Sequence, residues 1–146
     1  INSLYLKPDE LEQTVLERFK RYEIVKEKHT QWEEYLLEDA EYVVVAYGAT
    51  SRIVRSAINT AREQGIKVGL IRPKTIWPYP TEAISKAADT AKAFLCVEMS
   101  MGQMLDDVRL AVNGKAPVAF FGHTGGIVPT PNEVLDEIRK LAGGDR

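Results

Sequence analysis

The sequence predicts an α/β fold in three layers, with an open, mainly parallel sheet covered by helices on both faces. Residues 42–47 and 93–99 form nearly unbroken apolar runs, which are typical of strands buried on both faces. Shorter apolar runs follow at 67–72 and 118–121, and amphipathic helical patterns separate the four runs. Strands that alternate with helices indicate parallel pairing through right-handed crossovers.

The composition is that of an ordinary globular domain, with 146 residues of which 45% are apolar and 27% charged. The net charge of -2 gives no electrostatic reason for binding to nucleic acid or to a membrane. The single cysteine, Cys96, excludes a disulfide within the chain and favours a reducing, cytoplasmic compartment. Because the sequence begins at Ile1 rather than Met, we expect it to be a piece of a longer protein.

Residues 1–39 are expected to form a separate N-terminal segment, with a short lead-in and one long amphipathic helix. Asp9 has the chemistry of an N-cap, and Glu12 lies three residues later, as in a capping box. One apolar stripe runs through residues 11–36 without an intervening glycine or proline. The stripe predicts a helix that packs on the following domain or reaches a partner, and a break near residues 29–30 is the open alternative.

Residues 40–146 are expected to form the α/β domain, with its strands in the spatial order second, first, third, fourth. This order places a topological switch point between the first and third strands, where ligands or partners gather at the carboxyl ends. The segments at that point are residues 48–51 and 98–103. The helices are expected over residues 51–64, from 81 to about 91, from about 104 to 112, and from 131 onward.

The first candidate site is the turn and helix start after residues 42–47. Gly48 permits a sharp turn, and Ser51 stands where a helix N-cap belongs. Thr50, Ser51 and Arg52 at a helix N-terminus have the chemistry to bind an anion. An ordinary N-cap followed by a surface arginine is the commoner role of such a pattern, and both interpretations stay open.

The second group of candidates follows the third and fourth strands. Glu98 ends a buried strand, where a carboxylate can act as a base or, more commonly, can cap the next helix. Met99, Gly102 and Gln103 form the loop and helix start beside it. His123 lies in a glycine-dense loop whose backbone groups can form an anion-binding nest, although a structural hydrogen bond is the commoner role.

Two aromatic residues, Trp77 and Tyr79, lie in the proline-rich loop 73–80. The prolines exclude a helix or a central strand there. Aromatic side chains on such a stiff loop either close the core or anchor an interface, and both roles stay open. Cys96 is interpreted as a small hydrophobic residue of the core.

The sequence lacks the familiar cofactor motifs. Of the dinucleotide fingerprint G-x-G-x-x-G only Gly48 is present, and neither the phosphate loop G-x-x-x-x-G-K-[ST] nor the elbow G-x-S-x-G occurs. One cysteine cannot hold an iron–sulfur cluster. The residues therefore indicate an α/β domain with loops suited to contact rather than a self-sufficient active site.

Four segments, in their order and spacing, resemble a known family. Residues 41–51 read EYVVVAYGATS, 68–80 read VGLIRPKTIWPYP, 97–104 read VEMSMGQM, and 121–131 read FGHTGGIVPTP. Together they resemble the C-terminal domain of the α subunit of 2-oxoacid:ferredoxin oxidoreductases, in the 2-oxoisovalerate or 2-oxoglutarate branch. The resemblance covers nearly the whole chain, and His123 departs from it because arginine is expected there more often.

The resemblance implies a fold like the transketolase C-terminal domain, within a larger enzyme. That enzyme is expected to decarboxylate a branched-chain 2-oxoacid or 2-oxoglutarate oxidatively to an acyl-CoA. Thiamine diphosphate, magnesium, iron–sulfur clusters and coenzyme A are implied for the complete enzyme, with ferredoxin as partner, and no cofactor is implied for this domain. The domain is implied to be non-catalytic, to brace the thiamine domains and to contact other subunits, and a homodimer is left open.

Two functions of other classes also stay open. A free-standing module for anions or nucleotides would use residues 48–52 and 122–126. An oligomerisation module would use the apolar stripe of residues 11–36.

Overall fold

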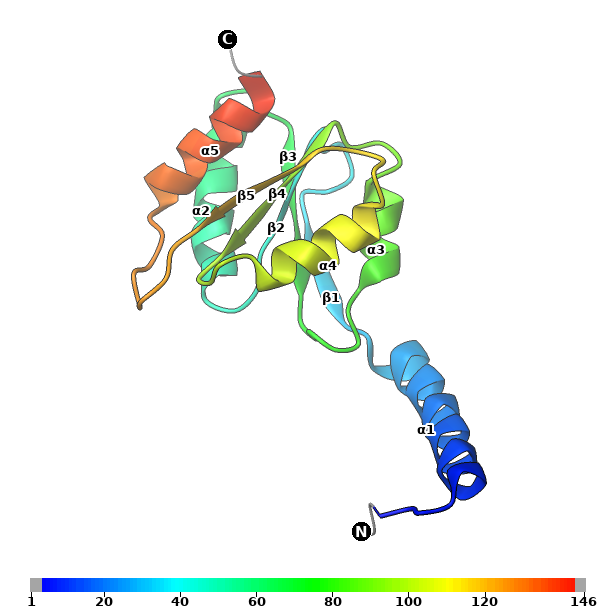
Figure 1. Ribbon diagram of the computed structural model, residues 1–146. Coiled ribbons are helices and arrows are strands. Elements are labelled where there is room, and N and C mark those ends of the chain that lie inside the picture. The colour runs from blue at the N-terminus through cyan, green and yellow to red at the C-terminus, as the bar shows by residue number, and fades with distance from the viewer. Residues whose placement is uncertain (1–3, 144–146) are drawn as a thin grey trace.

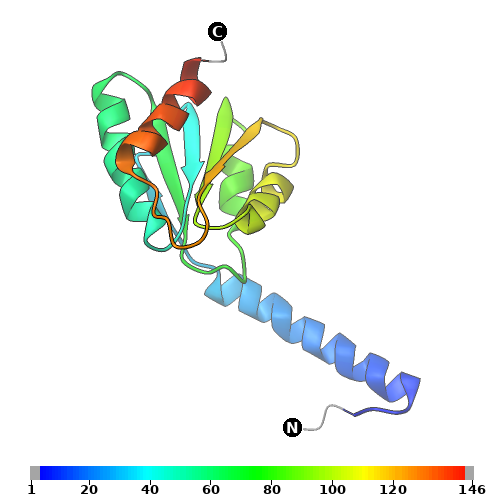
Figure 2. The ribbon, with the colours of Figure 1, turned by 60° about the vertical axis from the view of Figure 1, so that its left-hand side comes forward.

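The computed structural model describes residues 4–143 as a five-stranded sheet with helices on both faces and one helix that projects away from it (Figure 1). Helices α2 and α5 cover one face of the sheet, and α3 and α4 cover the other (Figure 2). The elements are α1 (Pro8–His29), β1 (Trp32–Tyr35), β2 (Tyr42–Val45), α2 (Thr50–Glu63), β3 (Val68–Pro73), α3 (Thr81–Ala87), β4 (Ala93–Glu98), α4 (Gln103–Val112), β5 (Val118–Gly122) and α5 (Pro131–Gly143).

The central strands confirm the predicted topology. The strand order is β1-β3-β2-β4-β5, and the pairs β3–β2, β2–β4 and β4–β5 are parallel. Because successive side chains of a strand point to opposite faces, Val43 and Val45 pack under α3 and α4 whereas Val44 packs under α2 and α5. Both faces are covered, which explains why these strands have no polar alternation.

The fifth strand, β1, was not expected, and the prediction of helix beyond His29 is wrong, whereas the alternative of a break near residues 29–30 is confirmed. The chain becomes extended at Thr30, and β1 then pairs antiparallel with β3 at the edge of the sheet. Only every second residue of β1 is half-buried, so an edge strand can carry the polar sequence WEEY. The apolar stripe of residues 11–36 is therefore divided between a helix and a strand.

Helix α1 begins at Pro8 and has no side-chain cap, so the expected N-cap role of Asp9 is wrong. Proline is favoured at the first helical position because its ring presets φ and its missing N–H has no intrahelical partner there. Among the described residues, α1 has no buried side chain, and both views show it extending away from the sheet (Figures 1 and 2).

Charged side chains and a close backbone approach hold β1 in place. The Glu33 carboxylate accepts hydrogen bonds from Arg55 of α2 and from Arg72 of β3, the latter at 3.2 Å. The Arg55 guanidinium beside Glu33 holds the pKa of that carboxyl below its ordinary value. At Gly69 of β3, an added Cβ would lie 2.6 Å from the carbonyl oxygen of Leu36. Only glycine lets the chain after β1 cross so closely over β3.

The substitution Gly69→Ala is expected to lower the free energy of unfolding by about 2 kcal/mol, because the new methyl group would meet backbone atoms that cannot move independently. Urea denaturation followed by far-ultraviolet circular dichroism measures this. Gly143→Ala is the matched control, since nothing lies within 4 Å of an added Cβ there. Equal stability of the two variants would contradict the close packing of this crossing.

The substitution Glu33→Gln is expected to destabilise the protein at neutral pH and to have progressively less effect in acid. A carboxyl group whose pKa is lowered by folding stabilises the native state above its unfolded pKa, and this contribution is lost as the pH falls through the folded pKa. Denaturation at pH 7 and at about pH 3 measures the difference, with Glu38→Gln at an exposed neighbouring position as the control. If the loss of unfolding free energy in Glu33→Gln were the same at both pH values, Arg55 and Arg72 would not stabilise β1 through the Glu33 charge.

Candidate functional site

All the predicted site residues lie at one edge of the sheet. The connections after β2, β3, β4 and β5 emerge together there, because the carboxyl ends of parallel strands share an edge. We name this region the carboxyl edge and define it by residues 46–52, 74–80, 98–103 and 123–130. The switch point between β2 and β4 lies at its centre, as predicted.

The Glu98 side chain organises the centre of the carboxyl edge. It is completely buried, and its carboxylate accepts hydrogen bonds from the Ser100 hydroxyl at 2.5 Å and from the backbone N–H groups of Met104 and Leu105 at 3.2 and 3.3 Å. These two N–H groups belong to the first turn of α4 and have no partner within a helix. Glu98 therefore caps α4 from the end of the neighbouring strand, and its lone pairs are engaged in structural bonds.

The residues that follow Glu98 form the loop between β4 and α4. Gly102 precedes α4 with φ of 100°, a conformation that glycine adopts without strain, and it is buried. Met99 and Gln103 are exposed at the same edge. Sequence reasoning missed Ser100, whose hydroxyl holds the carboxylate, although its position two residues after a buried glutamate could have indicated such a contact.

The start of α2 differs from the prediction. The helix begins at Thr50 after Ala49, so Ser51 is not the N-cap, and its hydroxyl donates to the carbonyl of Gly48 at 2.7 Å. Gly48 has φ of 57°, which turns the chain so sharply that the helix starts earlier than the cap pattern suggested. Thr50 and Ser51 are buried, whereas Arg52 is exposed.

The first N–H groups of α2 are largely engaged within the chain. The N–H of Ser51 donates to the carbonyl of Tyr47 at 3.4 Å, and that of Arg52 donates to the carbonyl of Ala49 at 3.1 Å. The Ser51 hydroxyl is engaged as well. An anion at this helix start would have to compete with these bonds, so the geometry gives little support to the anion-binding alternative.

Trp77 and Tyr79 take different roles, although they lie two residues apart. Tyr79 packs against the core under α4, and burial, with smaller contributions from Cys96, Asp107 and Glu98, raises the pKa of its phenol. The Trp77 ring remains 56% exposed and meets the ring of Tyr22 in α1 edge-on, with centroids 5.2 Å apart. Tyr79 closes the core, and Trp77 is the residue of the pair available to an interface.

His123 lies at the outer end of the carboxyl edge, against the start of α5. Its Nε2 atom is 3.4 Å from the carboxylate of Glu133, and its ring meets Phe121 edge-on at 5.3 Å. Glu133 also completes a capping box, because its carboxylate accepts hydrogen bonds from the N–H and the hydroxyl of Thr130. His123 thus connects the glycine-dense loop to a helix N-terminus, which is a structural role.

Large apolar side chains gather on the carboxyl edge and are exposed there. Outside α1 and its lead-in, nine large hydrophobic residues are exposed in the described chain, and six of them belong to this edge. Those six are Ile76, Trp77, Met99, Met101, Ile127 and Val128. Sequence reasoning missed four of them because isolated apolar residues in loops carry no periodic pattern. Exposed large apolar side chains that gather at one edge of a sheet are typical of a surface that another protein covers.

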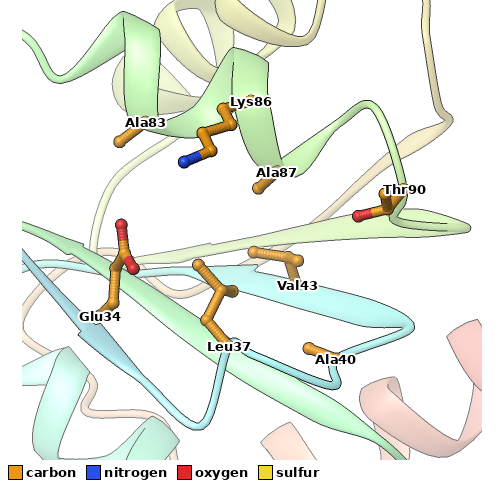
Figure 3. A pocket seen from close by; sticks show the side chains of 8 residues that line it. All are labelled: Glu34, Leu37, Ala40, Val43, Ala83, Lys86, Ala87 and Thr90. Carbon is orange, nitrogen blue, oxygen red and sulfur yellow. The ribbon is translucent and has the colours of Figure 1, made fainter.

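A hollow lies away from this edge, between α3 and the connection from β1 to β2 (Figure 3). Its volume is about 160 Å³, and the Lys86 side chain points toward Glu34 across its opening. Its floor consists of small apolar side chains, including Ala40, Val43 and Ala87. No residue of the carboxyl edge lines it, so this hollow and the predicted site are separate features.

The side chains present do not fit the metal groups that the resemblance implies for a complete enzyme. A cluster held by four thiolates cannot form on one cysteine, and Cys96 is buried in β4. Within residues 4–143, no three His, Cys, Asp or Glu side chains are grouped so that they could hold a metal ion. Over the same residues, no helix combines the length and apolar character needed to cross a bilayer.

This architecture defines an α/β domain of the open-sheet class, and comparison with known proteins identifies its family. The family model of pyruvate:ferredoxin oxidoreductase core domain II matches residues 40–134. The chain therefore belongs to this family.

Curated relatives include the ketoisovalerate oxidoreductase subunit VorB of Methanothermobacter thermautotrophicus, which is 43% identical over 98% of this chain and 40% of its own length. The 2-oxoglutarate synthase subunit KorA of Methanothermobacter marburgensis is 39% identical over 69% of this chain and 27% of its own. The chain thus spans well under half the length of these relatives.

Two solved structures share the fold. The 2-oxoglutarate:ferredoxin oxidoreductase of Magnetococcus marinus, with 2-oxoglutarate, coenzyme A and succinyl-CoA bound, matches with a TM-score of 0.81 at 23% identity over 93% of this chain and 24% of that chain. A split-gene transketolase, an inactive beta4 tetramer, matches with a TM-score of 0.67 at 18% identity over 80% of this chain and 42% of that chain. These likenesses confirm the predicted three-layer fold, which a transketolase domain shares.

The substitution Glu98→Ala is expected to lower the free energy of unfolding by about 3 kcal/mol, because it leaves two buried N–H groups of α4 without an acceptor. Chemical denaturation measures this loss, and amide hydrogen exchange at Met104 and Leu105 should accelerate. Glu63→Gln, on an exposed helix end, is the control. A variant as stable as the wild type would refute the capping role.

Proposed function

We propose that this chain is the second, non-catalytic domain of the α-type subunit of a 2-oxoacid:ferredoxin oxidoreductase. Its function there is to brace the domains that hold thiamine diphosphate and to form subunit contacts through the carboxyl edge. The observation that carries this proposal is the composition of that edge. Its polar groups at Glu98 and Ser51 are engaged in structural hydrogen bonds, while its apolar side chains are exposed.

The ketoisovalerate branch is the proposed substrate class. The relative named as a ketoisovalerate oxidoreductase subunit matches nearly the whole chain at 43% identity, whereas the 2-oxoglutarate synthase subunit matches 69% of it at 39%. In the complete enzyme, a branched-chain 2-oxoacid would be decarboxylated on thiamine diphosphate and its acyl group passed to coenzyme A. Iron–sulfur clusters outside this chain would carry the electrons to ferredoxin in the cytoplasm.

The proposed contact residues at the carboxyl edge differ in how they act. Trp77, Met99 and Gln103 are exposed and would touch the neighbouring domain directly, with Arg52 beside them. The buried or turn-forming residues would act by fixing the shape of the surface, and these are Gly48, Thr50, Ser51, Tyr79, Glu98, Gly102 and His123. This division follows from burial for Thr50, Ser51, Glu98 and Gly102, which their own domain encloses.

The test is assembly of the complete subunit with its partner subunits, carrying Trp77→Ala and Met101→Ser together. We expect the yield of assembled complex to fall about tenfold or more, since exposed anchors of this size carry much of an interface's affinity. Turnover per assembled complex should stay unchanged, and the wild-type complex should reduce ferredoxin faster with 2-oxoisovalerate than with 2-oxoglutarate. Leu110→Ser, equally exposed on the outer side of α4, is the control and should assemble normally.

Two outcomes would contradict the proposal. Normal assembly of the Trp77→Ala, Met101→Ser variant would remove the interface role of the carboxyl edge. Stoichiometric binding of thiamine diphosphate and Mg²⁺ to the 146-residue chain alone, measured by calorimetry, would show that the domain holds the cofactor itself.

A further inference from the structure

Helix α1 presents an apolar stripe that the described chain leaves largely uncovered. Its members recur at helical spacing on one face and are Leu11, Val15, Phe19, Tyr22 and Val25. Leu11 is 43% exposed and Phe19 57%. The α/β domain contacts the stripe in the C-terminal half of α1, where the ring of Tyr22 meets the ring of Trp77. A projecting helix of 22 residues, about 33 Å long, would not keep such a stripe in water without a partner.

The charges of α1 are divided between its two halves. Residues 8–17 carry four carboxylates and no cation, whereas residues 18–29 carry five lysines and arginines against two glutamates. The helix dipole accounts for part of this division, because carboxylates are favoured near an N-terminus and cations near a C-terminus. It does not account for the apolar stripe that runs between the charges.

We propose that α1 pairs antiparallel with α1 of a second copy of this chain. An antiparallel pair sets the acidic half of each helix on the basic half of the other, whereas a parallel pair would set like charges together. In the register that aligns the stripes, Leu11 meets the partner near its Val25. Glu12 and Lys26, which flank the same side of the stripe, then face each other across the pair. This inference does not rest on the proposed oxidoreductase function.

The shape of the molecule permits this arrangement. Helix α1 projects from the sheet in both views, so antiparallel pairing would place the two α/β domains at opposite ends of the helix pair (Figures 1 and 2). The N-terminal lead-in of one copy would then lie near the base of the other helix. There Leu6, which is 83% exposed, would lie beside the C-terminal end of the partner's α1.

The dimer is expected to be of moderate affinity. The seam covers only about three heptads, and Arg18 interrupts the apolar stripe close to the two-fold axis. Glu12 makes no ion pair within the described residues, and the exposed contact of Lys26 with Glu23, at 2.8 Å, is weak enough to be exchanged. We therefore expect a dissociation constant between about 1 and 100 µM.

Analytical ultracentrifugation of the 146-residue chain from about 1 to 200 µM tests the proposal. Glu12→Lys or Lys26→Glu alone should weaken dimerisation about tenfold, because each dimer then contains two like-charged contacts. The double charge exchange should restore it, and a mixture of the two single variants should form the mixed dimer. Lys20→Glu, which makes the same charge change on the opposite face, is the control and should dimerise normally.

A second pair of variants tests the stripe itself. Phe19→Ser should weaken dimerisation, whereas Ile24→Ser should not, although Ile24 is 51% exposed on the other side of the helix. Circular dichroism checks that α1 stays helical in each variant. A chain that is monomeric at every concentration would overturn the proposal, and so would a dimer that the two single charge changes do not weaken or that their combination does not restore.

Discussion

The capping of α4 by Glu98 is the interaction on which the carboxyl edge depends. A buried carboxylate at the end of β4 accepts hydrogen bonds from Ser100 and from two N–H groups of the first turn of α4. A buried polar group of this kind is tolerated only where it is hydrogen-bonded. The same bonds fix where α4 starts and how the chain turns after β4. In many open sheets the switch point binds a ligand. In this chain, the Glu98 carboxylate at the switch point caps α4.

The described chain exposes two apolar surfaces. One surface is the carboxyl edge, where side chains such as Trp77 and Met101 stand on loops fixed by buried strands. The other is the stripe of α1, which meets the body through the contact of Tyr22 with Trp77. Trp77 belongs to the carboxyl edge and contacts Tyr22 of α1. A partner bound at the carboxyl edge would therefore also fix the direction of α1.

Much of the fold could be predicted because buried parallel strands leave a strong pattern in sequence. The apolar runs around Val44 and Leu95 revealed the central strands, and the alternation with helices fixed their order. The edge strand β1 could not be predicted, since one of its faces is in solvent and its sequence WEEY continues the charged pattern of the preceding helix. The helix starts at Pro8 and Thr50 were misplaced because backbone geometry, rather than a capping side chain, sets them.

The candidate residues lie together at one edge of the sheet, as their places after the strands predicted, but their roles depend on burial, which spacing does not reveal. Trp77 and Tyr79 looked equivalent in sequence, and only packing separates them. The most direct test of the interface role is hydrogen–deuterium exchange of the carboxyl edge, compared between the isolated chain and the assembled enzyme. We predict that residues 74–80, 99–102 and 123–130 become strongly protected on assembly while the exposed end of α4 does not. Equal exchange of these loops in both states would contradict the account.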